Sequence, residues 1–225
     1  MVNSESTNFL YPFIDGEERD AGSLLTDLSA SAKAKARESA ALQQSTLAEC
    51  AGQVLACSTA MAERFASGGR MYCFGNGGSS TDAATFTALF AQPVTGRALG
   101  AVNLAADMSV VTALGNDVGF ELVFSRQLIA HATARDIAVA FSTSGNSADL
   151  ITALAEAHRR GLMTIGFAGY GGGEMANSDA VDFCFVVRSQ SIHRIQESQA
   201  LLGYQLWATT QQCLAAPSMS TGGTR

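Results

Sequence analysis

The sequence has few charged side chains and little positive charge, which limits its direct partners. Only 15% of its 225 residues are charged, the formal net charge is −6 and the pI is near 5.0. No basic stripe runs along the chain, so we expect no direct nucleic-acid partner. The one dense basic stretch, His158 to Arg160, falls where a helix is expected to end, and favourable interaction with the helix dipole accounts for it.

Cysteine motifs and long apolar runs are also missing. No C-x-x-C pair suggests a zinc or redox site, and no stretch approaches about 20 uninterrupted apolar residues. The start of the chain lacks the pattern of a secretion signal. We therefore expect a cytoplasmic protein with no membrane partner. The scattered cysteines are typical of small core residues in a reducing compartment: Cys50, Cys57, Cys73, Cys184 and Cys213.

The composition is typical of one globular domain with short appendages. Hydrophobic residues make up 47% of the chain, enough for a substantial core in a single domain over residues 21–215. Residues 1–20 mix aromatic side chains with an acidic run and form an N-terminal arm, which either packs on the body or docks on a partner subunit. Apolar residues at helical spacing predict two helices within 21–66. Residues 216–225 have nothing to bury and are expected to form a disordered tail.

A sheet core is expected over residues 70–214, where short apolar runs alternate with helical stretches. Turn residues bound each run, as expected for strands that are buried on both faces. Helices between strands require right-handed crossovers and hence a parallel sheet. A final helix is expected over about residues 192–214. The predicted fold is α/β, a doubly wound five-stranded parallel sheet flanked by helices, with strands at 70–74, 98–104, 136–141, 163–169 and 181–187.

Two glycine-containing loops follow predicted strands, and each leads into a helix. They read GNGGSS (75–80) and STSGNS (142–147). Ligands of doubly wound sheets bind beyond the carboxyl ends of the strands, and hydroxyls with backbone N–H groups at a helix N-terminus bind anions. Taken separately, the first loop could be a tight strand-to-helix turn, and the second an ordinary helix cap by Asn146 or Ser147. Because both loops are expected at the same edge of the sheet, beyond the carboxyl ends of the strands, together they favour a phosphate site.

The dinucleotide cofactors fit this pattern poorly. Ser80 stands where the G-x-G-x-x-G fingerprint has its third glycine, and the second predicted strand offers no carboxylate before Asp107. Binding of a nicotinamide or flavin cofactor is therefore disfavoured, and we expect no cofactor.

Five blocks of sequence, in this order, resemble a known family: FGNGGSSTDA, TALGNDVGFELVFSRQL, STSGNSADLITAL, GGGEMA and RIQES. They are similar to the sugar isomerase (SIS) domain of the phosphoheptose isomerases, which interconvert sedoheptulose 7-phosphate and a glycero-manno-heptose 7-phosphate. The resemblance covers roughly residues 35–214, and an ordered set of five blocks is far more specific than any one of them. The family is also similar to a replication-initiation regulator that keeps the fold as a binding module.

The resemblance implies an SIS fold, a phosphorylated sugar as ligand and a set of binding residues. Two of these residues, Asn116 and Asp117, would line the pocket from a neighbouring loop, and the alternative for them is a turn between helices. The residues that match the binding positions of the family are Asn76, Gly77, Ser79, Asn116, Asp117, Ser142, Thr143, Ser144, Ser147 and Gln196.

The catalytic positions of the family are replaced. Its isomerases carry a His and a Glu at i and i+4 on the helix after the first loop, where this chain has Thr85 and Leu89, and a His on the last helix, where it has Tyr204. Leucine has no proton to exchange, threonine is no base near neutrality, and tyrosine ordinarily titrates near pH 10. The same positions hold zinc in the family, so we expect no metal. Pro93 replaces a family arginine, for which Arg97 is a candidate substitute.

Two functional hypotheses remain open on the sequence. The first is a sugar-phosphate binding module without isomerase chemistry, acting as a sensor or as a subunit of an assembly. The second is an active aldose–ketose isomerase that uses His193 or Glu197, or a residue borrowed across a subunit interface. The resemblance and the excess of apolar helical surface both imply a homo-oligomer, by resemblance a tetramer.

Overall fold

The computed structural model describes residues 21–216, and the chain divides into two compact units, residues 1–40 and 41–225. The predicted N-terminal arm and the end of the predicted tail lie outside the described residues. Helix α1 (Ala21–Ala66) is one helix of 46 residues, so the prediction of two helices is wrong. Most of its residues favour helix, and the internal Gly52 costs only about 1 kcal/mol, too little to end it.

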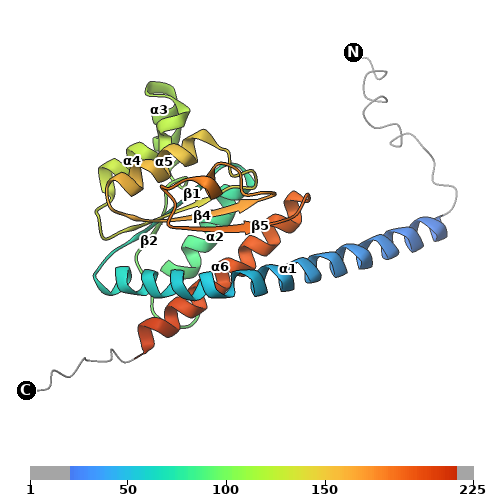
Figure 1. The fold of residues 1–225 in the computed structure, drawn as a ribbon. Coiled ribbons are helices and arrows are strands. Elements are labelled where there is room, and N and C mark those ends of the chain that lie inside the picture. Colours follow the sequence, from blue (N-terminus) through green and yellow to red (C-terminus); the bar gives the residue numbers. More distant parts are fainter. Residues whose placement is uncertain (1–20, 217–225) are drawn as a thin grey trace, which may run out of the picture. The chain divides into compact units, whose positions relative to one another are not determined.

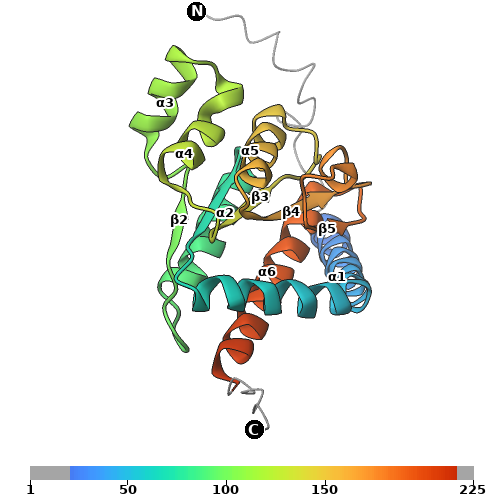
Figure 2. The ribbon, with the colours of Figure 1, turned by 60° about the vertical axis from the view of Figure 1, so that its left-hand side comes forward.

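The second unit contains a sheet of five parallel strands in the order β2-β1-β3-β4-β5 (Figure 2). This confirms the predicted doubly wound α/β fold. The predicted strand at 98–104 shortens to three residues because β2 lies at the edge and pairs only with Met71 to Cys73 of β1. The strands are β1 (Met71–Gly75), β2 (Ala101–Asn103), β3 (Ile137–Phe141), β4 (Met163–Gly169) and β5 (Phe183–Val187).

Helices cover both faces of this sheet (Figure 1). Helices α4 and α5 bury apolar side chains against one face. Helices α2 and α6, with the part of α1 that belongs to the second unit, cover the other face. The predicted final helix is confirmed as α6. The bounds are α2 (Gly78–Ala91), α3 (Met108–Asp117), η2 (Phe120–Leu122), α4 (Val123–His131), α5 (Ala148–Arg159), η3 (Met175–Asn177) and α6 (Ile192–Ala215).

Stacked phenylalanines join three adjacent strands on the α2–α6 face. The rings of Phe141 and Phe167 lie 4.4 Å apart, and those of Phe167 and Phe185 lie 5.4 Å apart. Phe86 of α2 meets both Phe141 and Phe167 edge-on, at 5.5 and 5.8 Å. Such aromatic contacts add to the burial of apolar area. They fix the middle of α2 against Phe141 at the end of β3, the residue from which the second glycine-containing loop starts.

The order of the strands places these loops side by side. Strand β1 pairs with β3, and Gly75 at the end of β1 lies opposite Phe141 at the end of β3. The chain order reverses between β1 and β3, and this reversal point is where ligands bind in doubly wound sheets. Both loops, 75–80 and 142–147, start from this pair of residues.

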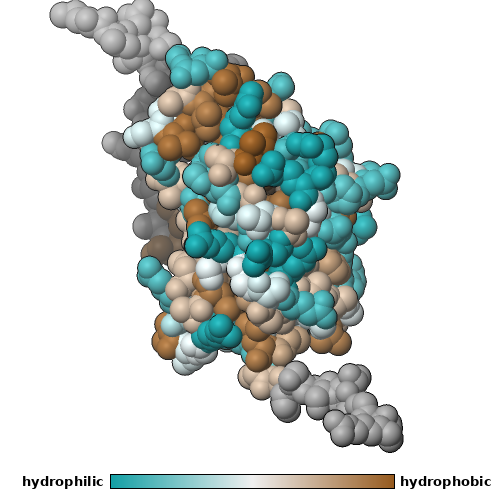
Figure 3. Space-filling model, turned by 90° about the vertical axis from the view of Figure 1, so that its left-hand side faces the viewer, coloured by the Kyte–Doolittle hydropathy of each residue, from teal (hydrophilic) through white to brown (hydrophobic). Residues whose placement is uncertain are grey.

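Helix α3, unlike the other α-helices of the second unit, buries none of its residues, and neither does η2, which follows it. Figure 3 shows hydrophobic surface where α3 lies, near the top of the view. We call the exposed large apolar side chains of α3 and of the segment that follows it the α3 patch: Met108, Val110, Val118 and Phe120. Within residues 21–216, no helix is both long and apolar enough to cross a membrane.

Candidate functional site

The first loop is a tight connection from β1 to α2. Gly75 lies so close to its neighbours that a Cβ there would be 2.7 Å from the carbonyl oxygen of Ser79 and 2.9 Å from that of Phe141. Gly77 precedes α2 with φ of 52° and ψ of −123°, a conformation that glycine adopts at little cost. The loop therefore aims the N-terminal end of α2, with its partial positive charge, at the rim of the sheet.

The second loop is held in shape by its own hydroxyls. Ser142 Oγ accepts a hydrogen bond from the N–H of Gly145 at 2.9 Å, and Ser144 Oγ accepts one from the N–H of Asn146 at 3.2 Å. Gly145 has φ of 69°, and a Cβ there would lie 2.1 Å from the carbonyl oxygen of Gly172. Ser147 stands at the N-cap of α5 but makes no capping hydrogen bond through its side chain. The helix-cap alternative for Ser147 is therefore not what the structure shows.

A hydrogen-bonded pair connects the two loops. Asn76 Nδ2 donates to both carboxylate oxygens of Asp149, at 3.0 and 2.9 Å. Asp149 is buried in the first turn of α5, and this burial raises the pKa of its carboxyl, although the bond from Asn76 opposes the shift. The side-chain N–H groups of Asn76 are engaged in positioning the loops, which leaves ligand contacts to the backbone and the hydroxyls.

Two glutamines of α6 fasten the loops from the other side. Gln196 Nε2 donates to Asp82 Oδ2 at 2.7 Å, and a Cβ on Gly78 would lie 2.9 Å from the same nitrogen. Burial raises the pKa of the Asp82 carboxyl, and the bond from Gln196 acts against that rise. Gln199 Nε2 donates to the carbonyl oxygen of Ser142 at 3.1 Å. The predicted residue Gln196 thus lies beside the first loop, and Gln199 holds the second.

A cavity of about 130 Å³ opens between α2 and α6, next to these glutamines. Both replaced family positions on α2, Thr85 and Leu89, line it. Thr85 Oγ1 donates to the carbonyl oxygen of Thr81 at 3.0 Å, and Leu89 packs against the core. Among the described residues that line the cavity, only Asp82 can titrate. The lining residues are Asp82, Thr85, Phe86, Leu89, Phe141, Gln199, Ala200 and Gly203.

The third replaced position lies on α6. Tyr204 is half exposed, and its ring is 5.4 Å from that of Trp207. His193 and Glu197 are exposed on the first turns of the same helix. The structure therefore places neither of these candidates among the side chains that line the cavity within one chain.

Three other predicted residues make contacts of their own. Asn116 and Asp117 end α3, where Asn116 Nδ2 donates to Asp117 Oδ1 at 2.8 Å, so they belong to a helix rather than to a loop or a turn. The backbone N–H of Arg97 donates to Gln211 Oε1 at 2.9 Å. Gln211 is fifteen residues beyond Gln196 in the sequence, about 22 Å along α6. Arg97 is therefore remote from the first loop within one chain.

The side chains at the family's zinc positions do not fit a zinc ion. Zinc requires nitrogen, sulfur or carboxylate ligands, and here Thr85 bonds to a backbone carbonyl, Leu89 packs in the core and Tyr204 contacts Trp207. Within residues 21–216, no three His, Cys, Asp or Glu side chains gather where they could hold a metal ion.

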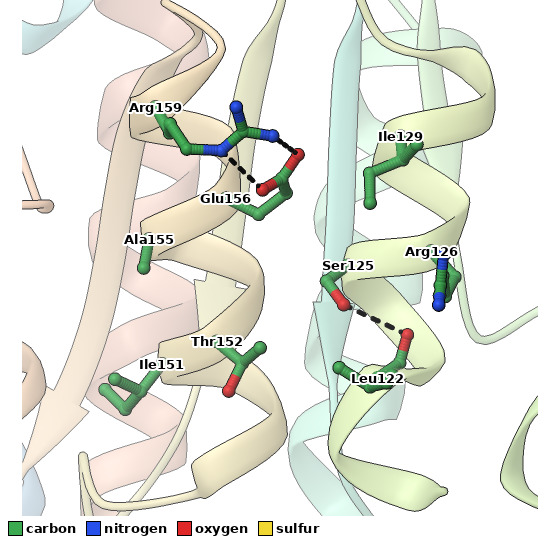
Figure 4. A pocket seen from close by; sticks show the side chains of 9 residues that line it. All are labelled: Leu122, Ser125, Arg126, Ile129, Ile151, Thr152, Ala155, Glu156 and Arg159. Atoms are coloured by element: carbon green, nitrogen blue, oxygen red, sulfur yellow. Dashed lines mark hydrogen bonds and ion pairs between the residues drawn. The ribbon is translucent and has the colours of Figure 1, made fainter. Parts of the chain in front are cut away.

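A larger hollow, of about 490 Å³, lies between α4 and α5, away from the loops (Figure 4). Glu156 accepts two hydrogen bonds from Arg159, at 2.9 and 2.7 Å, and Ser125 Oγ donates to the carbonyl oxygen of Leu122 at 3.1 Å. Glu156 and Arg159 thus bond to each other, and Ser125 bonds to the backbone. Apolar side chains, such as Ile129 and Ile151, supply much of the remaining wall. Arg126 and Thr152 also line the hollow, which is separate from the cavity between α2 and α6.

Asp149, Asp82 and Gln199 are parts of the site that sequence reasoning missed. Asp149 and Asp82 lie inside two of the quoted sequence blocks, so a buried carboxylate next to each loop could have been suspected. Gln199 is three residues, nearly one helical turn, beyond Gln196, and this spacing places both side chains on the same face of α6. That spacing was the available signal for Gln199.

Comparison with known proteins extends this geometry. A family model described as "SIS domain" matches residues 36–169. Phosphoheptose isomerase from Aquifex aeolicus is 36% identical over 186 residues, which cover 81% of this chain and 95% of the relative. The solved structure of phosphoheptose isomerase from Neisseria gonorrhoeae superposes with a TM-score of 0.76 at 33% identity, covering 82% of this chain and 99% of that one.

A more distant solved structure shares the fold. The NanR protein from Vibrio vulnificus, solved in complex with ManNAc-6P, has a TM-score of 0.54 at 17% identity, and the match covers 84% of this chain and 66% of that one. The fold that the sequence predicted is thus found both in isomerases and in a protein with bound ManNAc-6P.

Proposed function

Because the chain belongs to the SIS-domain family of the phosphoheptose isomerases, we propose that it binds a phosphorylated sugar without the isomerase chemistry of its relatives. In this role it acts as a sensor or as a subunit of a larger assembly. The ligand's phosphate is bound by the two glycine-containing loops, and its carbon chain extends toward the cavity between α2 and α6.

The observation that carries the binding proposal is the meeting of the two loops. They leave paired residues of β1 and β3, and each aims a helix N-terminus at the same rim. Helix N-termini and serine or threonine hydroxyls favour a phosphate group. The complex of the Vibrio vulnificus protein with ManNAc-6P supports the same class of ligand for this fold.

The loss of isomerase chemistry rests on the cavity. Aldose–ketose isomerisation needs groups that remove and return protons within hydrogen-bond reach of the substrate. Thr85 and Leu89 offer none. Asp82 already accepts a hydrogen bond from Gln196, which makes it a positioning group rather than a free base.

Isothermal calorimetry with inorganic phosphate and a panel of hexose and heptose phosphates tests the binding proposal. We expect micromolar to millimolar affinity for at least one sugar phosphate. The double variant Ser144→Ala/Ser147→Ala, in which the second loop loses two hydroxyls, should bind it more weakly. If the wild-type protein binds no member of the panel, the proposal is wrong.

A second candidate function is an active isomerase, and the exposed positions of His193 and Glu197 favour it in one respect. Both side chains are exposed on α6, so in an oligomer they can extend into the site of a neighbouring subunit. Conversion of sedoheptulose 7-phosphate, followed by NMR, distinguishes the two functions. Turnover that disappears in His193→Ala would replace our first proposal with this one.

We further propose that the protein is a homo-oligomer, by family resemblance a tetramer, in the cytoplasm. The α3 patch supports an oligomer, because monomers seldom expose clustered apolar side chains without a partner. All five cysteines are free thiols, as in proteins of reducing compartments. Light scattering tests the assembly, and a monomeric mass would contradict it.

A further inference from the structure

Gln199 is a fully buried polar side chain with one half of its amide unsatisfied. Its exposed fraction is 0%. The Nε2 atom donates to the carbonyl oxygen of Ser142 at 3.1 Å, and because a carbonyl can only accept, this bond fixes which end of the amide is which. The other end, Oε1, has no hydrogen-bond partner among the described residues.

Such an atom is unusual, since the large majority of buried polar side-chain atoms have a partner in protein or water. Three other buried side-chain atoms in the described part of the chain share this state, on Arg160, Ser198 and Trp207. Of the four residues, only Gln199 lines the cavity between α2 and α6. Its unsatisfied oxygen therefore belongs to a residue with space beside it.

The cavity that Gln199 lines is large enough for part of a ligand. Its volume of about 130 Å³ exceeds the roughly 10–15 Å³ of accessible space that one water needs. Phe86, Leu89 and Phe141 supply apolar walls, and hydrogen bonds strengthen where water is excluded. A ligand group that donates to Oε1 here would gain more than the same group on the open surface.

The polar side chains around the cavity present acceptors. Thr85 has given its hydroxyl hydrogen to the carbonyl of Thr81, so only its oxygen lone pairs remain. Asp82 contributes a carboxyl group, and Gln199 contributes Oε1. This set matches the hydroxyl groups of a sugar, each of which donates a hydrogen bond, and it repels a carboxylate.

We propose that Gln199 determines ligand specificity by accepting a hydrogen bond from a hydroxyl of the phosphorylated sugar through Oε1. This rests on the proposed function and deepens it, because the same side chain holds the first residue of the second loop. Gln199 would thereby contact the phosphate-binding loop through Nε2 and the sugar through Oε1. The ligand class is a neutral polyhydroxy sugar phosphate rather than a phosphorylated sugar acid.

Calorimetry on the wild type and on Gln199→Met tests this proposal. The probes are inorganic phosphate, fructose 6-phosphate, sedoheptulose 7-phosphate and 6-phosphogluconate. Gln212→Met, at an exposed glutamine near the end of the same helix, is the matched control. Because Gln199→Met also removes the bond to Ser142 of the second loop, some loss of affinity for inorganic phosphate is expected. The affinity for the preferred sugar phosphate should fall about tenfold further than that, as expected for one additional lost hydrogen bond. The wild type should bind 6-phosphogluconate more weakly than the neutral sugar phosphates.

Equal binding of the sugar phosphate by wild type and Gln199→Met overturns the inference, as does an equal loss of affinity for inorganic phosphate and for the sugar. Should the wild type bind no sugar phosphate at all, the proposed function falls together with the inference. Monodeoxy analogues of the preferred sugar phosphate, tested on the wild type alone, provide a measurement that does not depend on the variant's folding. One analogue should lose about tenfold in affinity, and equal binding of every analogue would refute the role of Gln199.

Discussion

Ser147 stands at the N-cap of α5 without using its hydroxyl as a cap. In Ser147→Ala we therefore expect the free energy of unfolding to change by less than about 0.5 kcal/mol, whereas a serine that caps its helix would cost about 1 kcal/mol. Affinity for the sugar phosphate should fall about three- to tenfold, because one hydrogen-bonding group is lost. Urea denaturation and calorimetry measure the two effects, and a large loss of stability with unchanged affinity would contradict this interpretation.

Asp149 gives the stability of the protein a predictable dependence on pH. Burial raises the pKa of its carboxyl in the folded state, so the folded chain binds a proton more readily than the unfolded chain. The stability contributed by Asp149 is thus present at low pH and decreases as the pH rises through the raised value. The amide introduced by Asp149→Asn would stay neutral at every pH and retain an acceptor for Asn76.

The free energy of unfolding of the wild type, relative to Asp149→Asn, should therefore decrease when the pH is raised from about 4, the ordinary pKa of an aspartate, toward neutrality. Urea denaturation of both proteins across this range measures the difference. Asp117→Asn, at an exposed carboxyl, is the control for the removal of one carboxylate. A difference that is constant with pH, or that grows as pH rises, would show that burial does not dominate at Asp149.

At the scale of elements, the connection from β1 to α2 depends on two glycines for different reasons. A Cβ on Gly75 would meet backbone oxygens at 2.7 and 2.9 Å, whereas a Cβ on Gly77 would meet nothing within 4 Å. We expect Gly75→Ala to destabilise the fold by about 3 kcal/mol, because backbone on both sides must shift. Gly77→Ala should cost about 1–2 kcal/mol through its positive φ alone. Thermal or urea unfolding measures the loss of stability in each variant. A larger loss in Gly77→Ala than in Gly75→Ala would refute the packing argument.

Most elements could be predicted because their signals are local. The run MTIGFAG matches β4 (Met163–Gly169) residue for residue, and the start of α6 at Ile192 follows from its sequence pattern. The single helix α1 was missed because apolar spacing does not reveal whether one helix continues into the next. The length of β2 was overestimated because the extent of an edge strand is set by its pairing with a single neighbour, and β2 pairs only with Met71 to Cys73.

The loops of the site could be predicted, but the contacts that hold them could not. Asn76 and Asp149 are 73 residues apart, and Gln199 and Ser142 are 57 apart. Sequence spacing carries no sign of such pairs, because they form only when the strands align. Asn76 was predicted to contact the ligand, and its side-chain amide also donates to the carboxylate of Asp149. Whether the predicted residues bind ligand stays a prediction for the calorimetry above.

For the molecule as a whole, the α3 patch is the surface on which assembly can be tested. Phe120 is 55% exposed, and α3 buries none of its residues. We expect Phe120→Ser to lower the mass in solution, with a change of less than about 1 kcal/mol in the stability of the subunit. Val94→Ser, at a fully exposed valine outside the patch, is the control. Light scattering and urea denaturation measure both quantities, and an unchanged mass would exclude the patch from the interface.

Trp207 is the only tryptophan of the chain, and it lies one helical turn beyond Gly203, which lines the cavity. Its indole is nearly buried, its nitrogen has no partner among the described residues, and its ring lies beside Tyr204. Emission from an indole shifts in wavelength and intensity when neighbouring dipoles and solvent rearrange. Occupancy of the cavity can therefore be followed by intrinsic fluorescence in the unmodified protein, without a dye or a coupled assay.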